Sequence, residues 1–181
     1  MGWQWGGGWL AELGFSDFAG STLVHSTGGA AALAGIMLLG ARSGRFDSKG
    51  EAKAMKPFAA SSIPLVTIGV FILWLGWFGF NGGSQLAIGT FDDAVAVSGI
   101  FINTNLAACG GVMAAATITR LMYGKTDVVQ MLNGAIGGLV AVTAEPLAPT
   151  PLAAIFIGAI GGLIVVFGTK LLFSFKLDDV V

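Results

Sequence analysis

The chain has 181 residues, of which 55% are apolar and only 10% are charged. A soluble domain carries roughly 25% charged residues, so this composition excludes a water-facing globular surface and predicts a polytopic membrane protein. The net charge of −1 gives no basic field for nucleic acid, and the single cysteine excludes an internal disulfide and a multi-cysteine metal site.

Five apolar segments follow one another along the chain, each a candidate for a membrane-spanning helix, which needs about 20 residues. They cover residues 18–41, 58–80, 94–121, 128–143 and 151–173, and the fourth is the shortest. The expected fold class is therefore all-α, a polytopic transmembrane helical bundle. Pro64 is expected to kink or break the second span, because proline removes a backbone donor from a helix.

The cationic residues predict the orientation in the membrane. With five crossings, all nine lysines and arginines fall at one set of ends: in a basic link at 42–57, around the link from the third to the fourth span, and near the end of the fifth. Basic ends face the cytoplasm, so we expect a multi-pass cell-membrane protein with its N-terminus outside and its C-terminus cytoplasmic. A chain that starts outside without a preceding span is expected to be a fragment of a larger protein.

Small residues recur at helical spacing inside the spans. The stretch GAIGGLVAV at 134–142 returns almost unchanged as GAIGGLIVV at 158–166. The pairs Gly134/Gly138 and Gly158/Gly162 allow helix backbones to approach closely. Residues 28–32, GGAAA, predict similar close packing on the first span.

Two ionisable residues, Asp17 and His25, occupy the start of the first span. We expect them about 12 Å apart along one helix axis, pointing roughly the same way but too distant to hydrogen-bond. Ionisable groups inside a span usually face a bundle interior or an aqueous path. No nucleophile motif accompanies them, so we expect no enzyme and no cofactor, and proton transfer or solute coordination fits better than hydrolysis.

Polar residues in the later spans allow two interpretations. The stretch LGWFGFNGGS at 75–84 is either an aromatic belt followed by a turn, or a hydrophobic stop at Phe80 beneath a polar vestibule at Ser84. The asparagines of NTN at 103–105 and Asn133 are expected to form hydrogen bonds between helices.

These motifs resemble the ammonium transporter family, which includes the methylammonium permeases and the Rh proteins. The stretches that carry the resemblance are WGGGWL at 5–10, DFAGSTLVH at 17–25 and GWFGFNGGS at 76–84. NT at 103–104, NGAIGGLVAVTA at 133–144 and DD at 178–179 support it. The resemblance covers essentially the whole chain and is nearer to the bacterial and archaeal transporters than to the Rh proteins.

The resemblance implies a trimeric, channel-like transporter of eleven helices, of which this chain corresponds to about the fifth to the ninth. Trp5 and Ser84 match the outer site that recruits NH4+, and Phe80 matches the inner of two phenylalanines that gate the pore. Asp17 matches an acid that supports the site structurally and electrostatically, and His25 matches the first of two pore histidines that relay the substrate. The second histidine lies beyond the DD pair in such proteins and is absent here.

Three further residues, Trp77, Asn81 and Thr143, are candidates for lining the pore. The expected substrate is NH4+/NH3, with methylammonium as an analogue, and the expected partners are membrane lipid and two further copies in a homotrimer. The basic link at 42–57 fits either a small cytoplasmic nitrogen-signalling protein or lipid headgroups. The alternative function is an ammonium-sensing receptor of the same fold, which a signalling domain encoded downstream would reveal.

Overall fold

The computed structural model describes residues 1–46 and 60–178, and every regular element in that part of the chain is a helix. A short helix precedes the apolar segments, and one of them opens with a π-helical turn. In chain order the elements are α1 (Trp9–Glu12), η1 (Ser21–Ser26), α2 (Thr27–Leu39), α3 (Ile63–Gly83), α4 (Phe91–Tyr123), α5 (Val128–Thr143) and α6 (Pro151–Ser174). The all-α prediction is confirmed.

Four of these segments are long and apolar enough to cross a membrane: Ser21–Leu39, Ile63–Gly83, Phe91–Tyr123 and Pro151–Ser174. α5 matches the predicted range 128–143 but has only 16 residues, so its crossing stays a prediction. The first span starts three residues later than expected and ends two earlier. The third is longer at both ends, and its 33 residues extend for about 50 Å at 1.5 Å per residue.

Side chains at the helix starts account for several of these boundaries. Thr90 and Asp93 form a reciprocal capping box before α4, while Asp127 and Thr150 accept backbone N–H groups of the first turns of α5 and α6. Each cap satisfies a donor that the helix itself leaves unpaired.

The prediction for Pro64 is wrong. The described part of the second span has no kink or break at the proline. The helix begins at Ile63 after the Ser62 cap, so that Pro64 lies in its first turn. Backbone N–H groups in the first turn have no acceptor within the helix, so the N–H that proline lacks is not missed there. The fixed φ of proline also suits the start of a helix.

The α4, α5 and α6 helices form the packed core, and their backbones touch through the predicted small residues. A Cβ added to Gly134 would meet the Gly111 carbonyl oxygen, 2.7 Å away, and one added to Gly158 would overlap the Ala107 carbonyl oxygen. Only the absence of a side chain allows this approach. The prediction from the repeated glycine stretches is confirmed.

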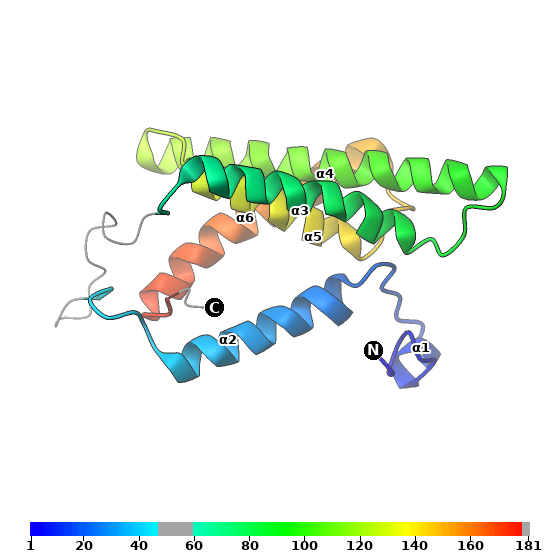
Figure 1. The fold of residues 1–181 in the computed structure, drawn as a ribbon, viewed down its shortest axis with the longest axis horizontal. Coiled ribbons are helices and arrows are strands. Elements are labelled where there is room, and N and C mark those ends of the chain that lie inside the picture. Colours follow the sequence, from blue (N-terminus) through cyan, green and yellow to red (C-terminus); the bar gives the residue numbers. More distant parts are fainter. Residues whose placement is uncertain (47–59, 179–181) are drawn as a thin grey trace.

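The α2 helix lies apart from this core (Figure 1). It has no buried residue, and η1 is the one described element that it contacts. Nothing in the described chain lies within 4 Å of a Cβ added at Gly28 or Gly29. The close packing expected for residues 28–32 is therefore not found among the described residues, since no helix of this part of the chain covers that face.

An ion cluster joins the far end of α2 to the segment after α6, and both ends lie on the same side of the molecule (Figure 1). The Asp178 carboxylate is buried and accepts from Arg42 Nε at 2.7 Å and Nη2 at 2.8 Å, and Arg45 Nε lies 3.3 Å away. The Arg42 hydrogen bonds lower the pKa of Asp178 to about 2. Of the basic link 42–57, residues 47–57 lie outside the described part.

Candidate functional site

The site begins at Asp17, whose buried carboxylate caps the first long helical segment. Oδ1 accepts the backbone N–H groups of Gly20 (3.1 Å) and Ser21 (2.9 Å), and Oδ2 accepts those of Thr22 (2.9 Å) and Leu23 (2.8 Å). Four unpaired donors at the positive end of a helix are thereby satisfied by one anion.

This geometry corrects the expected relation of Asp17 to His25. Asp17 does not lie on the helix two turns before His25, because the helix begins only at Ser21. Its carboxylate faces back into the helix N-terminus, and no oxygen of it is left without a backbone partner.

His25 lies in a π-helical turn, Ser21–Ser26, in which its N–H donates to the carbonyl of Gly20, five residues back. Gly20 has φ 108°, a left-handed value that suits glycine. A Cβ there would also come within 2.7 Å of Val24 Cγ2 and 3.1 Å of the Trp5 ring. Single π turns are frequent at functional sites, and this one was not predicted.

The imidazole of His25 lies in an aromatic cluster with two side chains of α3. It stacks on Trp77 at 4.9 Å between ring centroids and 23° between planes, and contacts Phe80 at 5.4 Å. Trp77 and Phe80 are 6.0 Å apart. Nε2 of His25 is buried and has no hydrogen-bond partner among the described residues. In this cluster the unpaired Nε2 of His25 therefore lies next to the aromatic rings of Trp77 and Phe80.

Thr143, the last residue of α5, is fully buried behind this cluster. Its hydroxyl oxygen accepts from the Trp77 indole Nε1 at 2.8 Å and its hydroxyl donates to the Leu139 carbonyl at 2.6 Å. Asn81 is also fully buried, between α3 and α4, where its Nδ2 donates to Thr104 Oγ1 at 3.0 Å. Both candidates for lining the pore therefore lie against neighbouring helices.

Asn103 also binds outside its own helix, but to a link and not to another helix as predicted. Its Nδ2 donates to the carbonyls of Pro146 (3.0 Å) and Pro149 (2.8 Å) in the link before α6. The bond between helices at this position is the one from Asn81 to Thr104, and the prediction for Asn105 stays a prediction.

The two predicted recruitment residues lie on different elements. The Trp5 indole donates to the Asp17 carbonyl at 2.8 Å and is 46% exposed. Ser84, the residue after α3, donates its hydroxyl to the Phe80 carbonyl at 2.8 Å. With its one proton used, the Ser84 oxygen keeps lone pairs for an incoming donor. Trp5 is thus bonded to Asp17, which caps the helix that carries His25, and Ser84 is bonded to Phe80, which contacts the His25 ring.

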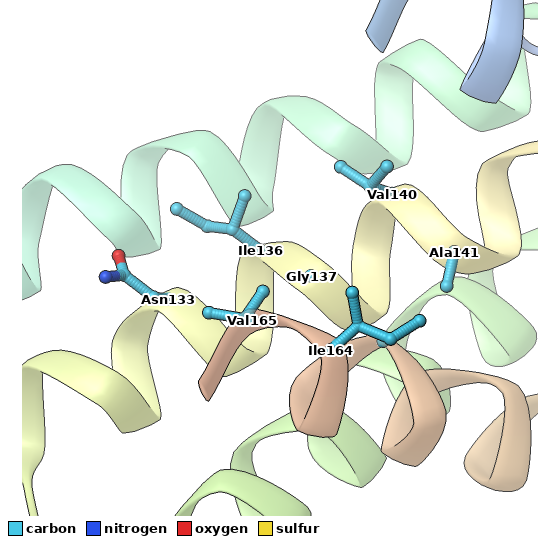
Figure 2. Close-up of a pocket in the computed structure, with 8 residues that line it drawn as sticks. Asn133, Ile136, Gly137, Val140, Ala141, Ile164 and Val165 are labelled. Atoms are coloured by element: carbon cyan, nitrogen blue, oxygen red, sulfur yellow. The ribbon is translucent and has the colours of Figure 1, made fainter. Parts of the chain in front are cut away.

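An open apolar groove of about 470 Å³ runs between α5 and α6 (Figure 2). Aliphatic side chains and glycine backbone line it, and Asn133 is its one amide side chain: the residues are Asn133, Ile136, Gly137, Val140, Ala141, Gly161, Ile164 and Val165. Asn133 is exposed in this chain, and the hydrogen bond between helices expected for it stays a prediction.

A family model described as the Ammonium Transporter Family matches residues 1–181. The chain belongs to the ammonium transporter family. Ammonium transporter Amt2 of Archaeoglobus fulgidus is 45% identical over 189 residues, covering 99% of this chain and 39% of that protein. Ammonium transporter 1 member 1 of Arabidopsis thaliana is 38% identical over 177 residues, covering 94% and 35%.

Solved structures of this family have the same fold. A structure titled Sensor Amt Protein has a TM-score of 0.86 and 36% identity, over 95% of this chain and 41% of that one. Saccharomyces cerevisiae Mep2 has a TM-score of 0.81 and 31% identity, over 96% and 36%. This ammonium transporter chain therefore spans about two fifths of the length of the relatives it matches.

Sequence reasoning missed two parts of this ammonium transporter chain. One is the Arg42–Asp178 ion pair, because the sequence places Arg42 in a basic link and Asp178 in a motif 136 residues later and gives no sign that the two meet. The other is the backbone attachment of the Asp17 loop to α5, where Phe18 N–H donates to the Ala144 carbonyl at 2.7 Å and Ala19 N–H to that of Thr143 at 3.1 Å. Backbone contacts carry no side-chain signal in a single sequence.

Proposed function

We propose that this chain forms part of a transmembrane ammonium pathway, with outer recruitment at Trp5 and Ser84, a gate at Phe80 and a relay at His25. The observation that carries the proposal is the stack of His25 on Trp77 next to Phe80, with the buried imidazole Nε2 unpaired. Asp17 supports this site through the helix that carries His25.

The chemistry of the recruitment residues suits a small cation. An indole face attracts a cation through its quadrupole, and the Ser84 oxygen accepts an N–H hydrogen bond. NH4+ offers four N–H donors around one charge, so it can use both contacts at once. The exposed Trp5 ring gives this step access to water.

Beyond Phe80 the surroundings become aromatic and a charged solute would lose most of its hydration, at a high cost in free energy. A neutral NH3 molecule would avoid this cost once a proton has left. The solute would then pass the cluster as NH3, with its proton moved separately. The unpaired His25 nitrogen is the polar atom of the cluster that could contact this NH3.

The partners of the whole protein follow as proposals. By family resemblance the protein assembles as a homotrimer in the lipid bilayer, with five crossings that leave the N-terminus outside and the C-terminus cytoplasmic. The basic link at 42–57 would then face the cytoplasm, where a nitrogen-signalling protein or lipid headgroups would meet it.

A sensing function is not favoured, because Amt2, named a transporter, has a higher identity to this chain than the sensor structure has.

The test is methylammonium uptake by the protein expressed from its complete gene. His25→Ala should reduce uptake to the background of cells without the protein, while membrane insertion and oligomer size stay as in the wild type. Thr169→Ala, which removes a hydroxyl on α6 that donates to the Val165 carbonyl of its own helix, should transport normally. Wild-type uptake by His25→Ala would overturn the assignment of His25 to the pathway.

A further inference from the structure

The last turn of α5 holds both partners of the His25–Trp77 stack. The Trp77 side is held through the hydrogen bond from its indole Nε1 to Thr143 Oγ1 at 2.8 Å. The His25 side is held through the backbone of the loop that starts its helix, where Ala19 N–H donates to the Thr143 carbonyl at 3.1 Å. Ser21 Oγ adds a bond of 2.8 Å to the Val140 carbonyl, one turn earlier on α5.

The Thr143 hydroxyl has one orientation available to it. Its single proton is donated to the Leu139 carbonyl at 2.6 Å, so the oxygen can only accept from the indole. Thr143 is fully buried and Trp77 is 8% exposed, so water does not compete for either group. A buried indole N–H that lost this acceptor would turn toward another one.

We infer that Thr143 is a positioning residue of the pathway: its hydroxyl sets the plane of the Trp77 indole, and this plane sets the orientation of the His25 imidazole. The inference rests on the proposed function for its effect on transport, but its geometry stands by itself. The contacts separate this role from lining the pore, because the Thr143 side chain faces α3 and its own helix.

The decisive variant is Thr143→Val, which keeps the shape of the side chain and removes the hydroxyl. In the protein from the complete gene, maximal methylammonium uptake should fall between roughly tenfold and a hundredfold, the range expected for a misplaced functional group. The concentration that gives half-maximal uptake should stay within about twofold, because a change confined to the relay leaves initial binding unaltered. Thr143→Ser retains the hydroxyl and should restore most of the uptake.

The matched control is Thr169→Val on α6. The Thr169 hydroxyl donates to the Val165 carbonyl four residues back, at 2.8 Å, as Thr143 does to Leu139. Among the described residues no indole N–H donates to the Thr169 oxygen, so the same chemical change should leave uptake as in the wild type. A general cost of removing a threonine hydroxyl from a span would affect both variants alike.

A spectroscopic measurement separates positioning from mere stability. The indole N–H resonance of Trp77 in 15N-tryptophan-labelled protein, identified by its loss in Trp77→Phe, should shift in Thr143→Val and return in Thr143→Ser. The ring resonance of His25, identified by its loss in His25→Ala, should shift in the same variants because the ring current over it changes. A merely structural threonine would leave the His25 resonance in place.

Each outcome decides between the two proposals. Unchanged uptake and an unchanged His25 resonance in Thr143→Val would overturn the positioning role, while loss of uptake in His25→Ala would still support the pathway. Normal uptake in His25→Ala would overturn the pathway, and the His25 resonance would still decide the geometry. If Thr143→Val does not fold, Trp77→Phe removes the same hydrogen bond from the other side, and its unchanged uptake would overturn the inference.

Discussion

At the scale of single residues, two polar groups that support the site, the Asp17 carboxylate and the Thr143 hydroxyl, are fully used by hydrogen bonds within the protein. Asp17 places both carboxylate oxygens on backbone N–H groups, and Thr143 uses its proton on its own helix and its oxygen on Trp77. His25 Nε2 differs, because the described residues give it no partner. The buried nitrogen therefore keeps a free hydrogen-bonding position, which the proposed pathway would use.

Asp17→Asn tests whether the acid acts through the helix. The amide NH2 would face two of the four backbone N–H groups, so the variant should lose about 2–3 kcal/mol of stability, the worth of hydrogen bonds to a charged group, and most of its uptake. Thermal unfolding in detergent measures the first and methylammonium uptake the second.

The control for that experiment is Asp92→Asn, which removes the same charge from an exposed position in the first turn of α4. It should unfold close to the wild-type temperature, because an exposed charge in the first turn of a helix contributes only about 0.3–1 kcal/mol. A wild-type unfolding temperature in Asp17→Asn would contradict the capping role that the geometry gives to the acid.

At the scale of elements, the sequence predicted helix identity well and local deviations poorly. Apolar length gave the spans, and glycine spacing gave the α4–α5–α6 contacts, because both depend on side-chain type alone. Three features depend instead on backbone bonds and on neighbouring segments: the π turn at His25, the late start of α3 at Ile63 and, within the described residues, the open space around Gly28. The periodicity of apolar residues in the sequence does not indicate such backbone bonds or neighbouring segments.

The glycine contacts make a second stability prediction. In Gly158→Ala the new methyl group would overlap the Ala107 carbonyl, so α4 and α6 must separate, at a cost of about 1–3 kcal/mol. A Cβ added at Gly168, on the same helix, has no atom of the described chain within 4 Å, so Gly168→Ala should be neutral or slightly stabilising, since alanine favours helix. Equal unfolding temperatures for the two variants would disprove the close contact.

At the scale of the whole molecule, the His25 segment is attached to the core at its two ends. The Asp17 loop bonds to the end of α5, and the Arg42–Asp178 pair joins the end of α2 to the segment after α6. Between these attachments the described part of α2 has no buried residue. Asp17 and Asp178 both lie in stretches that carry the family resemblance, but only the fold shows that their contacts hold the two ends of the His25 segment.

The ion pair predicts a dependence of stability on pH. The folded pKa of Asp178 is lowered to about 2, below the usual value near 3.9. The pair therefore stabilises the fold fully above about pH 4, and this contribution is lost as the pH falls from about 4 toward 2. With allowance for screening of Arg42, whose side chain is 46% exposed, we expect about 1–2 kcal/mol at neutral pH.

Asp178→Asn should accordingly unfold at a lower temperature than the wild type at pH 7, and the difference should shrink between pH 4 and pH 3. Thermal unfolding of both proteins across this range measures it. Arg42→Gln should show the same loss at neutral pH, and the double variant should lose little more than either single one. A difference that stays constant with pH would disprove the ionic contribution.

The central claim, that ammonium passes along the His25–Trp77–Phe80 cluster, is tested most directly by methylammonium uptake into proteoliposomes that contain the purified His25→Ala protein from the complete gene. The account predicts uptake at the background of empty liposomes, with an oligomer that elutes as the wild type does. Uptake at the wild-type rate by a correctly assembled His25→Ala protein would contradict it.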